Sequence, residues 1–172
     1  MTTAQTRVEE RWRRRLAREA KLTSGTIAGL QAAARQYPRS AMLAVLRAVA
    51  FHRAALANRR VGQPIPTRRA ERLYRTALGL APSAGPCWEG LAALLDIQER
   101  YPEAAAAARR AMLLARNTSE AADAIAYLSR ILAQQGKRRT ALRWAKDPRI
   151  RRSRSWFAKS TASEVISGTW HP

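Results

Sequence analysis

The stretch RRAERLYRTALGLAP, residues 68–82, has the spacing of an amphipathic helix that stops at a proline. Its small and apolar residues recur in a second helical stretch 34 residues further along the chain. The matching positions are Ala70, Tyr74, Ala77 and Leu80, followed by Ala104, Ala108, Ala111 and Leu114. A fixed period of this length indicates a helical repeat array, in which function belongs to a surface rather than to a catalytic cleft.

The stretch between these two, CWEGLAALLDIQERYP at residues 87–102, repeats with the same period. Its positions Trp88, Leu91, Ala92 and Leu95 are followed by Ala122, Ile125, Ala126 and Ser129, and only Ser129 departs from the pattern.

On these residues the sequence resembles the tetratricopeptide repeat family, whose 34-residue unit has the order W-x2-L-G-x2-Y, then A-x3-F, then P. The first group corresponds to Trp88, Leu91, Ala92 and Leu95, and the second to Ala70, Tyr74, Ala77 and Pro82 of the preceding unit. The resemblance spans roughly residues 24–146 and implies stacked pairs of antiparallel helices. Small residues let such helices approach, and large ones fill the space left by the next pair.

The sequence therefore predicts an all-α fold, a short tetratricopeptide-like solenoid, with a generic helical bundle as the alternative. Helices are expected at about 5–21, 24–36, 40–58, 67–80, 85–99, 102–116, 118–135 and 137–146. We divide the chain into a basic amphipathic N-terminal helix at 1–22, a repeat region at 23–147, and a basic C-terminal tail containing aromatic residues at 148–172.

Charge is the second strong feature of the sequence. The chain has 32 basic and 12 acidic residues, with a formal net charge of +20 at pH 7. The excess is uneven, because residues 84–128 hold four arginines against six acids, whereas residues 130–159 hold eleven basic residues against Asp147 alone. Such flanks predict an anionic partner, either nucleic acid or an acidic protein surface.

The sequence shows little support for catalysis, and we expect a protein that is not an enzyme and has no cofactor or metal. Cys87 is the only cysteine, so no intrachain disulfide or multi-cysteine metal site is expected. We interpret Cys87 as buried filler and His52 as a packed residue. No phosphate loop or nucleophile elbow occurs. Without a signal-peptide pattern or membrane span, we expect a cytoplasmic protein.

In the tetratricopeptide family, the first helix of each pair lines a concave groove that receives a peptide or a partner's helix. The resemblance implies these groove residues here: Met42, Val45, Val49, Glu89, Ala93, Asp96, Asp123, Tyr127 and Arg130. This groove is apolar at one end and acidic in the middle. It is therefore expected to accept a basic segment rather than a carboxylate terminus.

The candidate contacts to an anionic partner are Arg13, Arg14, Arg59, Arg60, Arg138, Arg139, Arg149, Arg151, Arg152, Arg154 and Trp156. For the tail, four alternatives stay open. It binds nucleic acid with Trp156 or Phe157 stacking on bases, inserts into a partner, folds back onto the chain's own groove, or is simply solvated. The first helix either caps the repeats through Val8, Trp12 and Leu16 or acts as a basic arm on phosphates or a membrane surface.

The leading functional hypothesis is a non-enzymatic adaptor or assembly scaffold that docks a protein partner, within a larger complex, and meets an anionic surface through its basic flanks. The alternative is an RNA- or DNA-binding protein in which the repeats serve as a scaffold.

Overall fold

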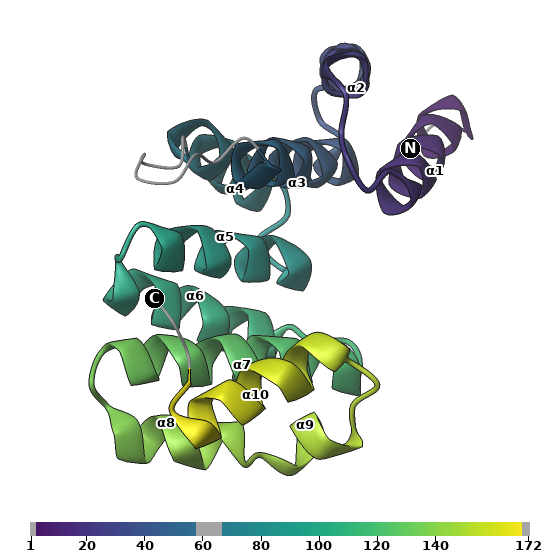
Figure 1. The fold of residues 1–172 in the computed structure, drawn as a ribbon. Coiled ribbons are helices and arrows are strands. Elements are labelled where there is room, and N and C mark those ends of the chain that lie inside the picture. The colour runs from purple at the N-terminus through teal and green to yellow at the C-terminus, as the bar shows by residue number, and fades with distance from the viewer. Residues whose placement is uncertain (1–2, 58–66, 170–172) are drawn as a thin grey trace. The chain divides into compact units, whose positions relative to one another are not determined.

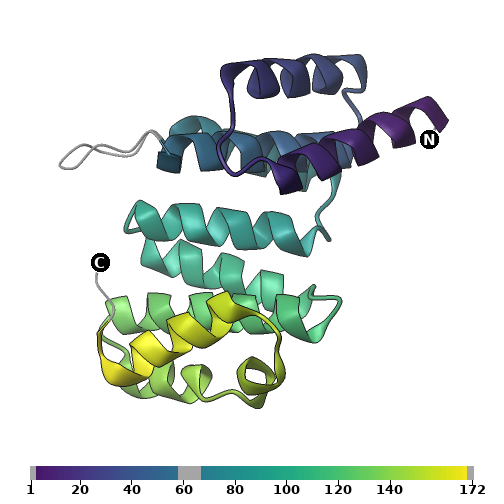
Figure 2. The same ribbon diagram turned by 45° about the vertical axis from the view of Figure 1, so that its right-hand side comes forward.

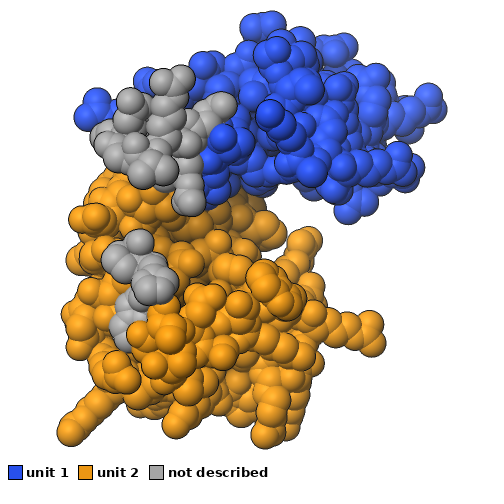
Figure 3. All heavy atoms as spheres, in the orientation of Figure 1, with its two compact units in different colours: residues 1–82 blue, residues 83–172 orange. Residues whose placement is uncertain are grey.

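The computed structural model describes residues 3–57 and 67–169, and these residues form helices and connecting turns without any strand. The chain divides into two compact units, residues 1–82 and 83–172 (Figure 3). The boundary falls inside the region predicted to hold the repeats. We describe each unit by itself.

The described residues of unit 1 form four helices, with α3 at their centre (Figure 1). The helices are α1 (Thr3–Arg18), α2 (Ser24–Gln36), α3 (Ala41–Ala57) and α4 (Arg68–Leu80). Helix α3 packs most extensively against α4, and it also contacts α2 and α1. The first helix is therefore part of the packed unit.

Local hydrogen bonds explain where the unit 1 helices begin. The Thr23 hydroxyl accepts a hydrogen bond from the Thr26 amide at 3.1 Å, which caps α2. The Ser40 hydroxyl accepts one from the Leu43 amide at 3.0 Å and caps α3. The same hydroxyl donates at 2.6 Å to the carboxylate of buried Glu9 on α1, so the cap of α3 also fixes α1.

The core of unit 1 forms around Trp12 and Leu16 of α1, which pack with Leu30 of α2 and Leu43 of α3. The Trp12 ring fits because position 29 on α2 is glycine. A Cβ atom at Gly29 would lie 2.8 Å from Cη2 of Trp12, closer than any real contact. The stripe of Val8, Trp12 and Leu16 predicted on the first helix therefore packs onto the neighbouring helices, as the capping interpretation required.

Unit 2 consists of consecutive helix pairs followed by a helix that returns along the unit (Figure 2). The helices are α5 (Gly85–Ile97), α6 (Tyr101–Leu113), α7 (Thr118–Gln134), α8 (Arg138–Ala145), α9 (Pro148–Arg152) and α10 (Trp156–Ser167). Helices α5 to α8 each pack against the next one in the chain. Helix α10 instead packs mainly against α7, and to a lesser extent against α8.

The alanines that defined the sequence period form the contact surfaces of unit 2. Ala104, Ala108 and Ala111 on α6 are all buried, as Leu91 and Leu95 on α5 are. Small side chains at these positions allow the close approach of neighbouring helices. Ser129, the residue that departs from the pattern, is also buried, and its hydroxyl donates to the Ala126 carbonyl at 2.8 Å. The serine therefore fits this apolar position without an unsatisfied donor.

Two turns of unit 2 share the same hydrogen-bond pattern. After α5, the Arg100 amide donates to the Leu95 carbonyl at 3.0 Å, and after α7, the Lys137 amide donates to the Leu132 carbonyl at 2.9 Å. The residue before each donor has a left-handed backbone, with φ of 59° at Glu99 and 73° at Gly136. The two helix pairs are thus closed by the same type of turn.

The eight helices predicted from the sequence are confirmed, with their ends shifted by at most three residues. Helices α9 and α10, in the segment interpreted as a tail, were not predicted. Helix α10 is capped at its start by Ser155, whose hydroxyl accepts from the Ala158 amide at 3.1 Å, and at its end by Gly168, with a left-handed φ of 76°. In the described part of the chain, no helix combines the length and the apolar character needed to cross a membrane.

Candidate interaction surfaces

The predicted groove residues lie on α3, α5 and α7. Met42 on α3 is exposed, and Val45 and Val49 on the same helix are half-buried. These three belong to unit 1, whereas the other six belong to unit 2.

In unit 2, the 34-residue period places pairs of groove residues at equivalent positions of α5 and α7. Asp96 and Arg130 form an ion pair with an N–O distance of 2.5 Å. The Arg130 guanidinium also lies 5.1 Å from the centre of the Tyr127 ring, within the range of a cation–π contact. The structure therefore joins these predicted groove residues into one polar cluster.

A second cluster on the same two helices is acidic. Burial, together with the nearby charges of Asp123 and Glu120, raises the pKa of Glu89 to about 7. Burial also raises the pKa of Asp123, an effect that its hydrogen bond from Ser155 partly offsets. Among the described residues, no group of three or more His, Cys, Asp or Glu side chains has the arrangement of a metal site.

Helix α10 covers part of the α7 face. The Phe157 ring lies 4.7 Å from the Tyr127 ring, centre to centre, with a tilt of 39°. The Ser155 hydroxyl donates to the Asp123 carboxylate. Among the alternatives for the C-terminal segment, the structure thus shows the one in which it folds back onto the chain's own helices. Of the two aromatic residues considered for stacking on bases, Phe157 is half-buried with its ring on Tyr127, whereas Trp156 is 79% exposed.

On α1, the two arginines predicted to contact an anionic partner are paired with an acidic residue of the same helix. Arg13 and Arg14 both donate to the Glu10 carboxylate at 2.8 Å, and they hold the pKa of Glu10 at about 2. Part of their charge is therefore neutralised. Arg7 and Arg18 are exposed and form no ion pair with the described residues, although the sequence analysis did not select them. Arg59 and Arg60 lie outside the described residues.

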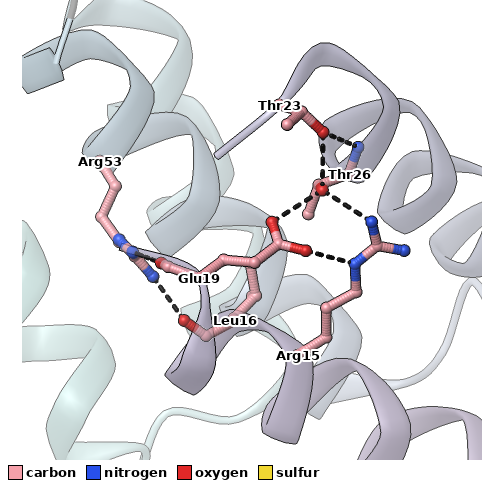
Figure 4. A network of polar contacts seen from close by, with 6 residues as sticks. All are labelled: Arg15, Leu16, Glu19, Thr23, Thr26 and Arg53. Carbon is pink, nitrogen blue, oxygen red and sulfur yellow. Dashed lines mark hydrogen bonds and ion pairs between the residues drawn. The ribbon is translucent and has the colours of Figure 1, made fainter. Parts of the chain in front are cut away.

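The polar contacts in Figure 4 hold α1 in place and so orient its basic surface. The Arg53 guanidinium on α3 donates at 2.6 Å to the Leu16 carbonyl, and also to the Glu19 carbonyl, at the end of α1. Arg15 donates to the Glu19 carboxylate at 2.6 Å, and the Thr26 hydroxyl of α2 donates to it at 2.8 Å. Three helices of unit 1 are thereby joined at the carboxyl end of α1, where a cation is favoured.

In unit 2, the predicted basic residues lie on the last three helices. Arg138 and Arg139 are exposed on α8. The Arg149 guanidinium forms an ion pair with the Asp147 carboxylate at 2.9 Å, so the positive charge of Arg149 is compensated by its neighbour. The remaining predicted arginines are exposed and form no ion pair with the described residues: Arg151, Arg152 and Arg154.

A hollow of about 350 Å³, here called the α8–α10 groove, lies between α8, α9 and α10. Its lining residues are Ala145, Lys146, Asp147, Ile150, Arg151, Lys159, Ala162, Ser163 and Ile166. Four of them are apolar, and Ile166 is 45% exposed. Three are basic. Only Arg151 had been selected from the sequence, because the groove depends on two helices that the sequence analysis missed.

Cys87 and His52 are both buried. Burial raises the pKa of the Cys87 thiol to about 12, so the thiolate is scarce at neutral pH. His52 is buried with Nδ1 3.3 Å from the Tyr74 hydroxyl, and burial lowers its pKa. Its Nε2 has no hydrogen-bond partner, so the ring is only half satisfied.

No model of a known protein family matches this sequence, and no curated protein matches it significantly.

Proposed function

We propose that the chain is a non-enzymatic adaptor, a short tetratricopeptide-like solenoid whose α8–α10 groove binds an acidic, amphipathic segment of a partner protein. The observation that carries the proposal is the lining of that groove, which combines apolar residues with three exposed basic side chains, while its acidic residue, Asp147, is paired with Arg149.

The two kinds of lining residue serve different parts of binding. Apolar side chains of a partner gain roughly 25 cal/mol per Å² of surface that they bury against Ile150, Ala162 and Ile166. Lys146, Arg151 and Lys159 attract acidic residues and accelerate association at low salt. A phosphate backbone would use the charges but leave the apolar floor uncovered, which favours a peptide.

The register of α5 and α7 supports the assignment of a repeat. Asp96 pairs with Arg130, and Glu89 interacts electrostatically with Asp123, so residues 34 apart meet on neighbouring helices. The shared turn at residues 95–100 and 132–137 supports the same assignment.

The test is the binding of a labelled peptide helix with glutamates on one face and leucines on the other, measured by fluorescence anisotropy. We expect Ile166→Asp to weaken binding at least tenfold. The matched control is Leu113→Asp on α6, where the side chain is 71% exposed and lies outside the groove. Equal affinities of both variants, or equal binding of a peptide with glutamates alone, would contradict the proposal.

A second candidate function is nucleic-acid binding, favoured by one specific observation. Trp156 is 79% exposed and directly follows a segment with three unpaired arginines, Arg151, Arg152 and Arg154. An exposed ring beside cations is the arrangement on which bases stack, worth about 1–3 kcal/mol per base.

Purification from native cells at two salt concentrations, with and without nuclease, separates the two functions. A protein retained through both treatments supports the adaptor. Nucleic acid that leaves at the higher salt, without any retained protein, supports the second candidate. In that case Trp156→Ala should weaken binding to a single-stranded oligonucleotide about tenfold, whereas Arg109→Ala with Arg110→Ala on α6 should not affect the stacking contribution.

A further inference from the structure

A second hollow, entirely within unit 1, has a volume of about 260 Å³ and lies between α2, α3 and α4. Its lining residues are Gln31 and Arg35 from α2, Arg47 and Phe51 from α3, and Arg69 and Leu73 from α4. One arginine thus comes from each of three helices, and none of the lining residues is acidic. The proposed peptide groove does not include any of these residues.

No acceptor or carboxylate among the described residues pairs with these three arginines. Neither Arg35, Arg47 nor Arg69 forms an ion pair or a side-chain hydrogen bond, and Nε of Arg47 is buried without an acceptor. Elsewhere in the same unit, Arg53 binds backbone carbonyls and Arg15 binds a carboxylate. What distinguishes this pocket is that it brings three such arginines together and that the Nε of one of them, Arg47, is buried.

The arrangement is electrostatically unfavourable when the pocket is empty of anions. The charge of Arg69, acting together with burial as the larger cause, lowers the pKa of Arg47. The Arg69 guanidinium lies 4.2 Å from the centre of the Phe51 ring. This cation–π contact fixes the position of the guanidinium but does not provide an acceptor for its N–H groups. A buried donor without an acceptor destabilises the fold, and an anion bound here would satisfy it.

The number of the donors in the pocket lining selects the class of anion. A carboxylate has two oxygens in one plane and is matched by a single guanidinium. Three guanidinium groups from three helices, with the Gln31 amide beside them, match an anion that has at least three acceptor oxygens and close to two charges. We propose that this pocket binds the phosphate group of a small ligand, either the free ion or a phosphomonoester.

The test is isothermal titration of the full chain with inorganic phosphate and, separately, with glycerol phosphate, in a chloride buffer of constant ionic strength. Binding of either ligand supports the proposal, and their relative affinities identify the source. Arg47→Gln is expected to weaken binding about tenfold because it removes a charged, two-pronged donor. Arg35→Gln, at an exposed position that tolerates substitution, should weaken it as well.

The matched control is Arg72→Gln, which removes an exposed arginine from α4 outside the pocket and should change the affinity less than twofold. Three results would overturn the proposal. One is phosphate binding no tighter than chloride, and another is an equal effect of all three substitutions. The third is binding of a DNA duplex that depends on Arg47 while both small ligands fail to bind.

Discussion

Helices α1 and α10 both carry exposed basic residues, but they are attached to their units in different ways. Helix α1 is held by one large ring, Trp12, and by charged contacts of Arg53 and Glu19. Helix α10 is held by small buried residues, among them Ala158 and Ala162, with one aromatic pair and one hydroxyl contact. Helix α1 is thus held by a few strong contacts, whereas helix α10 is held by many weak ones.

The largest effect is expected from Trp12→Ala. Removing a buried tryptophan leaves a cavity in the unit 1 core and should lower the free energy of unfolding by about 3–5 kcal/mol. Chemical denaturation measures the loss. Trp156→Ala, the same deletion at a 79% exposed position on α10, serves as the control and should cost less than about 0.5 kcal/mol. Equal losses would show that α1 is not anchored through its ring.

The next effect concerns the charged contacts of α1. Arg53→Met keeps most of the apolar stem but leaves the Leu16 and Glu19 carbonyls without their donor. We expect a loss of about 1.5–3 kcal/mol, the range for hydrogen bonds to charged groups. Hydrogen exchange should become faster in the last turn of α1. Arg18→Met, at an exposed position on the same helix, should leave the exchange rates unchanged.

A smaller effect is expected at α10. Phe157→Ala removes the ring packed on Tyr127 and should cost about 1–2 kcal/mol, because an aromatic pair adds only 0.5–1.5 kcal/mol beyond its buried area. Hydrogen exchange should accelerate within α10 but not within α8. Ile166→Ala on the same helix provides the control. Loss of all protection in unit 2 would contradict the distributed attachment described above.

The smallest effect is expected at Glu89, in the acidic cluster that also contains Asp123. The folded-state pKa of Glu89, about 7, lies above the ordinary value of 4.5, so the folded state binds more protons between these pH values. The contribution of Glu89 to the free energy of unfolding is therefore most favourable at and below pH 4.5, and it is lost as the pH rises to about 7. Glu89→Gln should raise the stability at pH 8 by on the order of 1 kcal/mol and have less effect at pH 5.

Thermal unfolding at the two pH values measures this difference. Glu99→Gln, which removes an exposed carboxyl group in the turn after α5, serves as the matched control. A constant difference between wild type and Glu89→Gln across the pH range would show that Glu89 is not held in the acidic cluster.

The sequence predicted the parts of the fold that depend on periodicity. Residues 34 apart, such as Asp96 and Arg130, could have been paired in advance because they occupy equivalent positions of successive repeats. The partners of Arg53 could not have been predicted, because they are backbone carbonyls at the end of α1, and their position depends on how α1 packs against α3. Helix α10 had visible end signals in Ser155 and Gly168, but its basic, mixed surroundings obscured them. The α8–α10 groove was missed for the same reason.

The fit between Trp12 and Gly29 has a consequence for how this sequence can change over evolution. Because a methyl group at position 29 would collide with the ring, Gly29 cannot be replaced by a larger residue while Trp12 stays. Homologous chains with alanine or a larger residue at position 29 should carry a smaller residue at position 12, so the two positions are expected to covary. Such homologues should also hold their first helix more weakly, since the ring is its main apolar anchor.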